Sequence, residues 1–430
     1  MPRYLQLLLL AGLLVACSSQ PTPAPTAPPV VNTAASAATA TSPASTPTVA
    51  ATAAPTSGPA LTNTAPAATS AATAAATPTA APGVTPTPEA VNPLTGLPLS
   101  DPTVLDRRPV AIKIANFPRR VRAAQTGLSA ADNVWEHYAE GGTTRFTAIF
   151  LSQGPDRIGN VRSARLIDTY LGQAYQAMLV ASGSSEGTLN RLRQTDFFKR
   201  VIAEATGYHG CPLLCREAPA SETADKLFTS APAVWDLATK LGVNGRQDLS
   251  GFVFDAQAPA GGTPITTAHI DWQVGNTVAE WRYDAGAQVY DRWIDSDTMP
   301  TLTQHIDTLN SQPLTAANVV VIYANYVTSN IHESDSSAEP FFFSYDIELY
   351  GSGPAKLFRD GQMYDLRWTR DKVKGGLPRL TDASGNVAAL RPGNIWFEAV
   401  STMSVNKPAG DTFTIQVHVP DPSVAATAQP

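Results

Sequence analysis

Long apolar runs and basic residues are both scarce in this chain of 430 residues. Beyond residues 7–16 no segment is apolar enough to span a bilayer, which excludes a protein held by transmembrane helices. The 30 Lys and Arg residues are outnumbered by 36 Asp and Glu residues, giving a formal net charge of −6. Because nucleic-acid binding depends on clustered basic side chains, this balance argues against a nucleic-acid partner.

Charged residues are absent from residues 18–88, which consist almost wholly of Ala, Thr, Pro and Ser and include 14 prolines. Such a composition cannot bury enough apolar surface to offset its ordering entropy. We therefore expect residues 17–91 to form a disordered stalk, about 45–50 Å long as a flexible coil and about 220 Å long as polyproline II. The stalk is either a spacer that holds a module away from a membrane or a tether of no specific length.

The first residues have the pattern of an export signal. Arg3 precedes the apolar run Leu7–Ala16, which has the length of a signal-peptide core and is too short for a transmembrane helix. The run ends in Leu14-Val15-Ala16-Cys17, which resembles a lipobox. That resemblance implies that residues 1–16 are removed and that Cys17 carries acyl chains such as palmitate. Two acyl chains anchor a protein stably, so we expect an extracytoplasmic lipoprotein held on the outer face of the cell membrane through Cys17.

Only Cys211 and Cys215 remain once Cys17 is assigned to lipid. An even pair in an oxidising compartment predicts a Cys211–Cys215 disulfide. A zinc site with His209 is an alternative, but a fourth ligand is not evident. We therefore predict no metal and no cofactor.

The length of residues 92–420 predicts two domains. The turn-forming segment Ala258–Gly262 suggests a division into residues 92–258 and 263–420. We expect an α+β fold, with an N-terminal α/β layer domain followed by a β-rich C-terminal domain.

Strand and helix patterns alternate in the first part, whereas the second part contains strand patterns separated by Gly, Asp and Asn turns. The strands expected in the first part are Val110–Ala115, Val134–Tyr138, Arg145–Leu151, Arg157–Val161 and Met178–Ala181. The expected helices are Leu166–Ala177, Ser185–Arg193 and Ala231–Leu241. The strands expected in the second part are Ala268–Gln273, Thr277–Tyr283, Gln288–Arg292, Asn318–Tyr326, Phe341–Leu349, Ala355–Arg359 and Trp396–Val400.

Acidic and basic residues gather in two segments of the first part, Glu136–Arg145 and Gly159–Arg165. Arginine binds carboxylate or phosphate with two parallel hydrogen bonds, and a helix N-terminus favours an anion. These properties predict a pocket for a phosphate-bearing or other anionic ligand of the cell envelope. The candidate ligand-binding residues are Glu136, Glu140, Arg145, Arg162, Ser163 and Arg165. The alternative is an internal network in which Glu136 and Glu140 pair with Arg145 and Arg162.

The same segments resemble the YerB-like lipoprotein family, a family of unknown function. The resemblance covers essentially the whole folded region and is most specific at Glu140–Phe146 and Ile158–Arg165. It includes Asn92–Leu97, Arg108–Ala111, Gln125–Asp132, His305–Asp307, Asn318–Val321, Gly351–Gly353 and Pro392–Trp396. It implies a two-part module on a lipid anchor but no activity.

Two enzymatic alternatives have weaker support. A looser similarity to the LytR–CpsA–Psr phosphotransferases, which act on polyprenyl-pyrophosphate-linked glycopolymers, implies that Arg145, Arg162 and Arg165 clamp phosphates and that Asp168 holds a metal. Gly183–Gly187 has the pattern of a serine-hydrolase turn, although a serine-rich helix start produces the same pattern. We assign no catalytic residue and favour a binding lipoprotein, with the phosphotransferase and a purely structural scaffold as alternatives.

Overall fold

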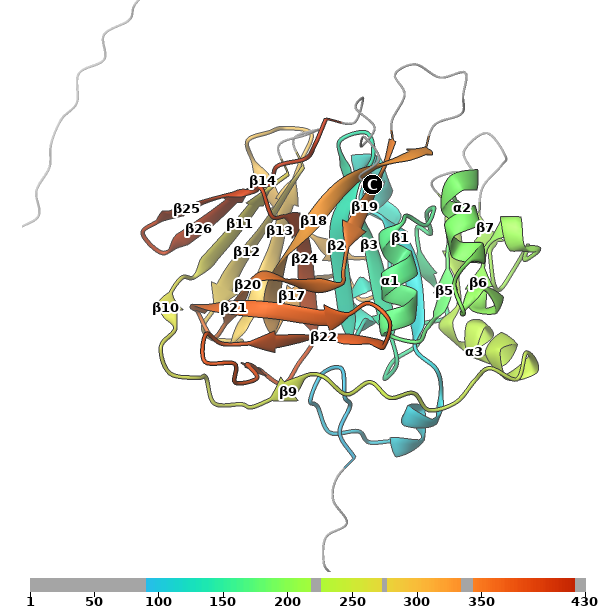
Figure 1. Ribbon diagram of the computed structural model, residues 1–430, viewed down its shortest axis with the longest axis horizontal. Coiled ribbons are helices and arrows are strands. Elements are labelled where there is room, and N and C mark those ends of the chain that lie inside the picture. The colour runs from blue at the N-terminus through green and yellow to red at the C-terminus, as the bar shows by residue number, and fades with distance from the viewer. Residues whose placement is uncertain (1–89, 218–225, 273–276, 334–342, 422–430) are drawn as a thin grey trace, which may run out of the picture. The chain divides into compact units, whose positions relative to one another are not determined.

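The computed structural model of the protein describes residues 90–217, 226–272, 277–333 and 343–421 (Figure 1). The expected signal peptide, Cys17 and nearly all of the stalk lie outside the described residues, so these remain predictions. In the described part of the chain, no helix combines the length and the apolar character needed to cross a membrane.

Three antiparallel strands form the centre of the first part: β1 (Val110–Ala115), β2 (Asn133–Ala139) and β3 (Thr143–Phe150). β3 pairs with β2, from which a tight turn separates it, and with β1. Gly141 and Gly142 take positive φ angles in that turn, which glycine accepts without steric cost. The strands predicted in this region are confirmed, and every residue of β1 and β2 is buried.

Three short helices follow: α1 (Ile167–Ala174), α2 (Glu186–Arg193) and α3 (Ala231–Lys240). Ser185 caps α2 and Ser230 caps α3, and each hydroxyl accepts a hydrogen bond from a backbone N–H of the first turn. The predicted helices Ser185–Arg193 and Ala231–Leu241 are confirmed, and each starts at its serine cap.

A twelve-stranded sheet contains β1–β3 and runs through both halves of the sequence. Its further strands are β5 (Met178–Val180), β6 (Val201–Ile202), β10 (Thr263–Pro264), β18 (Asn318–His332), β19 (Phe343–Glu348), β20 (Gly351–Arg359), β21 (Gln362–Asp371), β22 (Gly375–Thr381) and β24 (Ile395–Ser401). β24 lies parallel to both β2 and β18 and thereby joins the two halves. The described residues belong to one compact unit.

A second sheet has seven strands, all from the second half of the chain. They are β11 (Thr267–Asp271), β12 (Val278–Asp284), β13 (Val289–Asp295), β14 (Leu302–Gln304), β17 (Thr315–Ala316), β25 (Val405–Ala409) and β26 (Thr412–Gln416). Part of the core lies between the two sheets, where the ring of Trp396 on β24 lies 5.0 Å from that of Trp281 and 5.4 Å from that of Phe146. In Figure 1 this sheet lies on the left and α1–α3 lie on the right.

Short paired strands complete the fold. They are β4 (Ile158–Gly159), β7 (Cys215–Arg216) and β8 (Leu227–Thr229), then β9 (Val253–Phe254) with β23 (Ala389–Leu390), and β15 (Ile306–Asp307) with β16 (Gln312–Pro313). The 3₁₀ helices are Pro102–Asp106, Arg119–Ala124, Leu128–Ala130, Phe198–Arg200 and Glu204–Thr206.

The fold is mainly β, which corrects the expected N-terminal α/β layer. β2 lies inside the large sheet and not at the edge of a separate layer, because β24 pairs with it. The expected helix Leu166–Ala177 is too long, since Gln176 has a left-handed φ of 50° after α1. The expected strand Arg157–Val161 shrinks to the two residues of β4. The division after residue 258 remains a prediction.

Candidate anion site

Arg165 lies just before α1 and is paired inside the protein. Its Nε contacts the carboxylate of Glu140, and its Nη1 lies 3.2 Å from Oε2 of Glu333. Burial alone would lower the pKa of Arg165, but the two carboxylates outweigh it and raise the pKa above its usual value. With 8% of its surface exposed, Arg165 belongs to an internal network and is not an open clamp.

The two carboxylates that hold Arg165 are themselves well bonded. Glu140, in the turn after β2, accepts hydrogen bonds from the hydroxyl of Ser344 (3.2 Å) and the backbone N–H of Tyr345 (3.3 Å). Oε1 of Glu333 accepts from the hydroxyls of Ser185, Thr188 and Ser344, at 2.8, 2.8 and 2.9 Å. Sequence reasoning missed Glu333, because Glu333 lies 148 residues from Ser185 along the chain.

Arg145 on β3 is half-buried and differs from Arg165 in its partners. Its Nη1 donates to the backbone carbonyl of Ser163 at 2.8 Å, and no ion pair of Arg145 is found among the described residues. Burial lowers the pKa of Arg145 to about 9, with Arg165 and Arg162 adding to the effect and Glu140 opposing it. Among its described contacts, the guanidinium of Arg145 therefore binds a carbonyl and no carboxylate, whereas that of Arg165 binds two carboxylates.

Arg162 and Ser163 lie next to Arg145 in the segment between β4 and α1. Both are half-buried, and the hydroxyl of Ser163 lies 3.4 Å from that of Ser182. The structure therefore brings together five of the six predicted ligand-binding residues: Glu140, Arg145, Arg162, Ser163 and Arg165.

A fully buried lysine, which the sequence analysis missed, lies beneath these arginines. Nζ of Lys113 on β1 lies 2.9 Å from Oδ2 of Asp168 and 2.5 Å from Nε2 of His137, and it donates to the hydroxyl of Thr147. Burial lowers the pKa of Lys113 to about 8, although Asp168 opposes the shift. The alternating faces of β1–β3 place Lys113, His137, Arg145 and Thr147 on one side of the sheet.

The placement of Asp168 corrects its expected role as a metal-side carboxylate. Its two oxygens accept hydrogen bonds from Lys113, from Thr147 at 2.8 Å and from the backbone N–H of Arg165 at 2.6 Å. Within the described residues, no group of three or more His, Cys, Asp or Glu side chains could hold a metal ion.

Glu136 lies apart from this cluster, which corrects the expected pairing with Arg145 or Arg162. Neighbouring side chains of a strand point to opposite faces, so Glu136 faces the second sheet while His137 faces the arginines. There Glu136 pairs with the fully buried Arg292 of β13. Its other carboxylate oxygen accepts from Thr144 at 2.6 Å and Asn116 at 3.1 Å.

The polar groups around Arg292 join the two sheets. The guanidinium lies 5.0 Å from the ring of Trp396, and its Nη1 lies 2.7 Å from Nδ1 of His305. Glu398 on β24 lies opposite Glu136 in the strand register and accepts a hydrogen bond from Nε1 of Trp281 at 2.9 Å. Burial and the nearby Glu136 raise the pKa of Glu398 well above its usual value.

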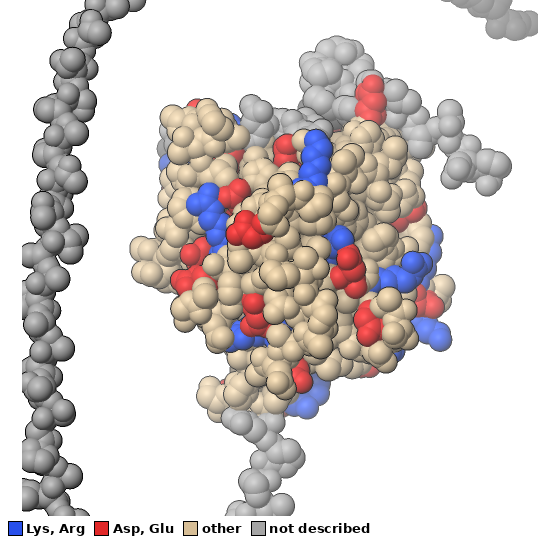
Figure 2. Space-filling model, turned by 90° about the vertical axis from the view of Figure 1, so that its left-hand side faces the viewer, with Lys and Arg blue, Asp and Glu red and all other residues tan. Residues whose placement is uncertain are grey.

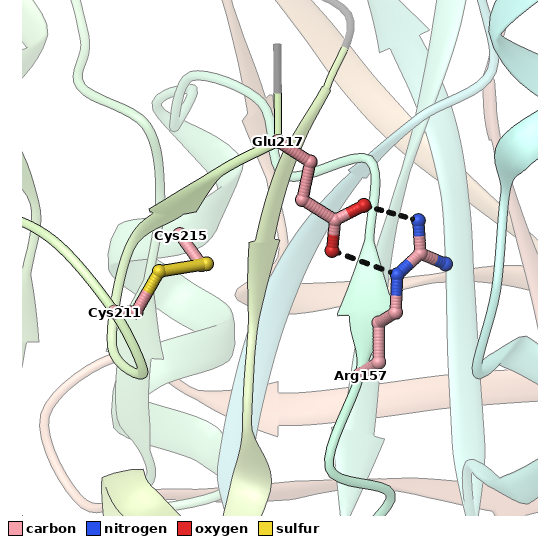
Figure 3. The surroundings of a disulfide bond; sticks show 4 residues. All are labelled: Arg157, Cys211, Cys215 and Glu217. Carbon is pink, nitrogen blue, oxygen red and sulfur yellow. Dashed lines mark hydrogen bonds and ion pairs between the residues drawn. A yellow bond between two sulfur atoms is a disulfide. The ribbon is translucent and has the colours of Figure 1, made fainter.

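The predicted Cys211–Cys215 disulfide is confirmed (Figure 3). The disulfide closes a short loop that leads into β7. Glu217, the residue after β7, pairs with Arg157 at 2.8 Å. A disulfide removes these thiols from the zinc site that was the alternative.

Charged side chains of the outer surface are mixed in sign on the side of the second sheet. Figure 2 shows acidic and basic residues interspersed there, without a broad basic area. This distribution agrees with the acidic net charge of the chain.

Comparisons with known proteins find one family for most of the described region. Residues 94–244 match the family described as "Protein of unknown function (DUF3048) N-terminal domain", and residues 268–397 match the corresponding C-terminal domain. The protein of Bacillus subtilis strain 168 named "Putative lipoprotein YerB" is 28% identical over 325 residues, covering 74% of this chain and 89% of YerB. The crystal structure of YerB from Bacillus subtilis matches with a TM-score of 0.59 and 27% identity, covering 73% of this chain and 97% of that one.

Proposed function

The chain belongs to the YerB-like family, and from that premise we propose that it is a lipid-anchored, extracytoplasmic binding module for an anionic ligand of the cell envelope. Membership in the family supports the lipoprotein part of this proposal. The arrangement around Arg145 supports the binding part.

The anchor rests on Leu14-Val15-Ala16-Cys17 together with the lipoprotein name of YerB. Replacing Cys17 by alanine removes the thiol that carries the acyl chain, so we expect Cys17→Ala to lose palmitate labelling and to leave the membrane fraction. Labelling of the variant at the level of the unmodified protein would refute the anchor.

The binding site rests on one observation: Arg145 is a half-buried residue whose guanidinium donates to a single carbonyl among its described contacts. A guanidinium has five N–H donors, so several are left for a phosphate or carboxylate group. The hydroxyl of Ser163 and the charges of Arg162 and Arg165 lie close enough to support such an anion. This assigns the primary contact to Arg145 and gives Arg165 a supporting role.

The binding test is a calorimetric titration of the purified protein with pyrophosphate. Charge-assisted hydrogen bonds contribute about 1.5–3 kcal/mol, so Arg145→Ala should weaken binding about ten-fold or more. Arg157→Ala is the matched control, because Arg157 is half-buried, as Arg145 is, and pairs with Glu217 outside the cluster. Equal affinities for Arg145→Ala and Arg157→Ala would remove Arg145 from the site.

A structural scaffold is the second candidate, because the ion pairs of Arg165 with Glu140 and Glu333 hold separate segments together. Absence of any pyrophosphate binding by the full protein would favour it over the anion-binding module. The phosphotransferase alternative has no support from Asp168, whose oxygens are bonded to Lys113, Thr147 and Arg165.

A further inference from the structure

The carboxylate of Glu333 is bound as an anionic ligand would be. Oε2 lies 3.2 Å from Nη1 of Arg165, and Oε1 accepts hydrogen bonds from the hydroxyls of Ser185, Thr188 and Ser344. The side chain is 4% exposed. One guanidinium and three hydroxyls form a donor set that suits any carboxylate or phosphate oxygen pair, wherever that group comes from.

These four donor residues come from three separate places in the fold. Arg165 precedes α1, Ser185 and Thr188 begin α2, and Ser344 belongs to β19. The donors of the first half therefore form most of the site, while its carboxylate comes from the second half.

Glu333 lies just beyond the last residue of β18. β18 ends at His332, and its pairing with β19 shifts register between Thr328 and His332. The side chain of Glu333 thus makes specific contacts at the point where the regular ladder ends. Glu333 is not among the paired residues of β18 and β19, so withdrawal of its carboxylate would break side-chain contacts and no ladder pairing.

We propose that Glu333 is an internal substitute ligand, which occupies an oxyanion site formed by Arg165, Ser185, Thr188 and Ser344. An external carboxylate or phosphate group competes with it for these donors. The proposal rests on the proposed function, because it describes the regulation of the same arginine cluster. The charge of Glu333 opposes the lowering of the pKa of Arg145 that burial causes. When an internal group fills a site, the apparent dissociation constant of a ligand rises in inverse proportion to the fraction of molecules in which the site is free.

The test is chemical rescue of the full protein. Glu333→Ala removes the carboxylate and leaves Arg165, Ser185, Thr188 and Ser344 unchanged. We expect a lower melting temperature in an inert buffer, and a larger rise on addition of acetate or inorganic phosphate than in the unaltered protein. Glu217→Ala is the matched control, because it breaks an exposed ion pair with Arg157. The stronger of the two anions identifies the preferred group.

A rescue of Glu333→Ala no larger than that of Glu217→Ala would overturn the proposal. Glu333→Gln is the second variant, for use if the alanine variant does not fold, because glutamine keeps the shape and loses the charge. Its phosphate dissociation constant should be lower than that of the unaltered protein by about ten-fold or more. An unchanged constant would also overturn the proposal.

The outcomes separate this inference from the proposed function. If pyrophosphate binding depends on Arg145 but Glu333→Ala shows no rescue, the binding module stands and the internal ligand fails. If Glu333→Ala is rescued but Arg145→Ala binds pyrophosphate normally, the oxyanion site stands and the assignment of Arg145 fails.

Discussion

Two carboxyl groups, those of Glu136 and Glu398, lie opposite each other across β2 and β24 with no exposed surface. Arg292 pairs with Glu136, whereas Oε2 of Glu398 has no hydrogen-bond partner among the described residues. Two buried carboxylates side by side repel each other, and the lower-energy arrangement keeps a proton on one of them. Because the guanidinium of Arg292 stabilises the charge of Glu136, we assign the proton to Glu398, whose pKa is raised by burial and by the neighbouring Glu136.

This arrangement predicts a pH dependence of stability at the residue scale. The folded protein keeps a proton on Glu398 that the unfolded chain loses near the usual pKa of a glutamate. The free energy of unfolding should therefore fall as the pH rises above the unfolded pKa, by at most about 1.4 kcal/mol per pH unit until the folded pKa is reached. Glu398→Gln cannot lose that proton and should have a flatter profile.

Urea unfolding of both proteins between about pH 5 and about pH 7 measures this difference. Glu217→Gln is the control. Arg157 lowers the pKa of Glu217 at the surface, so loss of the Glu217 carboxylate cannot flatten the fall of stability with rising pH. Parallel profiles for the unaltered protein and Glu398→Gln would contradict a retained proton on Glu398.

At the scale of the elements, the pairing of β20 with β21 depends on a glycine. A Cβ atom on Gly353 would lie 2.5 Å from the carbonyl oxygen of Tyr323 and 2.6 Å from Nε1 of Trp368. That indole nitrogen donates to the same carbonyl at 2.9 Å, so the three groups are in direct contact. The space beside Gly353 is closed by backbone and by a buried ring.

We expect Gly353→Ala to lower the free energy of unfolding by about 1–3 kcal/mol, because neither neighbour can move without breaking the indole hydrogen bond. Urea denaturation followed by tryptophan fluorescence measures the change. Ser352→Ala, at an exposed neighbouring position, is the control and should remain close to the unaltered protein. A Gly353→Ala variant as stable as Ser352→Ala would show that β20 can shift to make room.

At the scale of the whole molecule, the large sheet passes through both regions that match DUF3048 domains. β2 of the first region pairs with β24 of the second, and Trp135 stacks on Phe397 across this seam at 4.1 Å between ring centroids. Separating the two regions would expose a sheet edge and a stacked aromatic pair to water.

We therefore predict that the described region unfolds in one cooperative transition. Tryptophan fluorescence and far-ultraviolet circular dichroism should give the same urea midpoint, because tryptophans lie in both regions and in both sheets. Two separated transitions would show that the regions unfold independently in spite of their common sheet.

The sequence by itself determined the features that depend on neighbouring residues. The strand β1, the serine caps of α2 and α3 and the Cys211–Cys215 disulfide all follow from local pattern or short spacing. The YerB-like family was also evident from short motifs, since these preserve local backbone geometry. The charge pattern identified five residues that do lie in one cluster, because β3 lies near the segment before α1.

Tertiary structure alone decided which charges pair. Arg292 lies 156 residues from Glu136, and no local spacing connects them. The alternation of β2 sends Glu136 to one face of the sheet and His137 to the other, so residues adjacent in sequence join different networks. The parallel pairing of β2 with β24 made one sheet out of two expected layers. Long-range strand pairing is fixed by packing over the whole chain, which is why the sequence predicted the strands but not their partners.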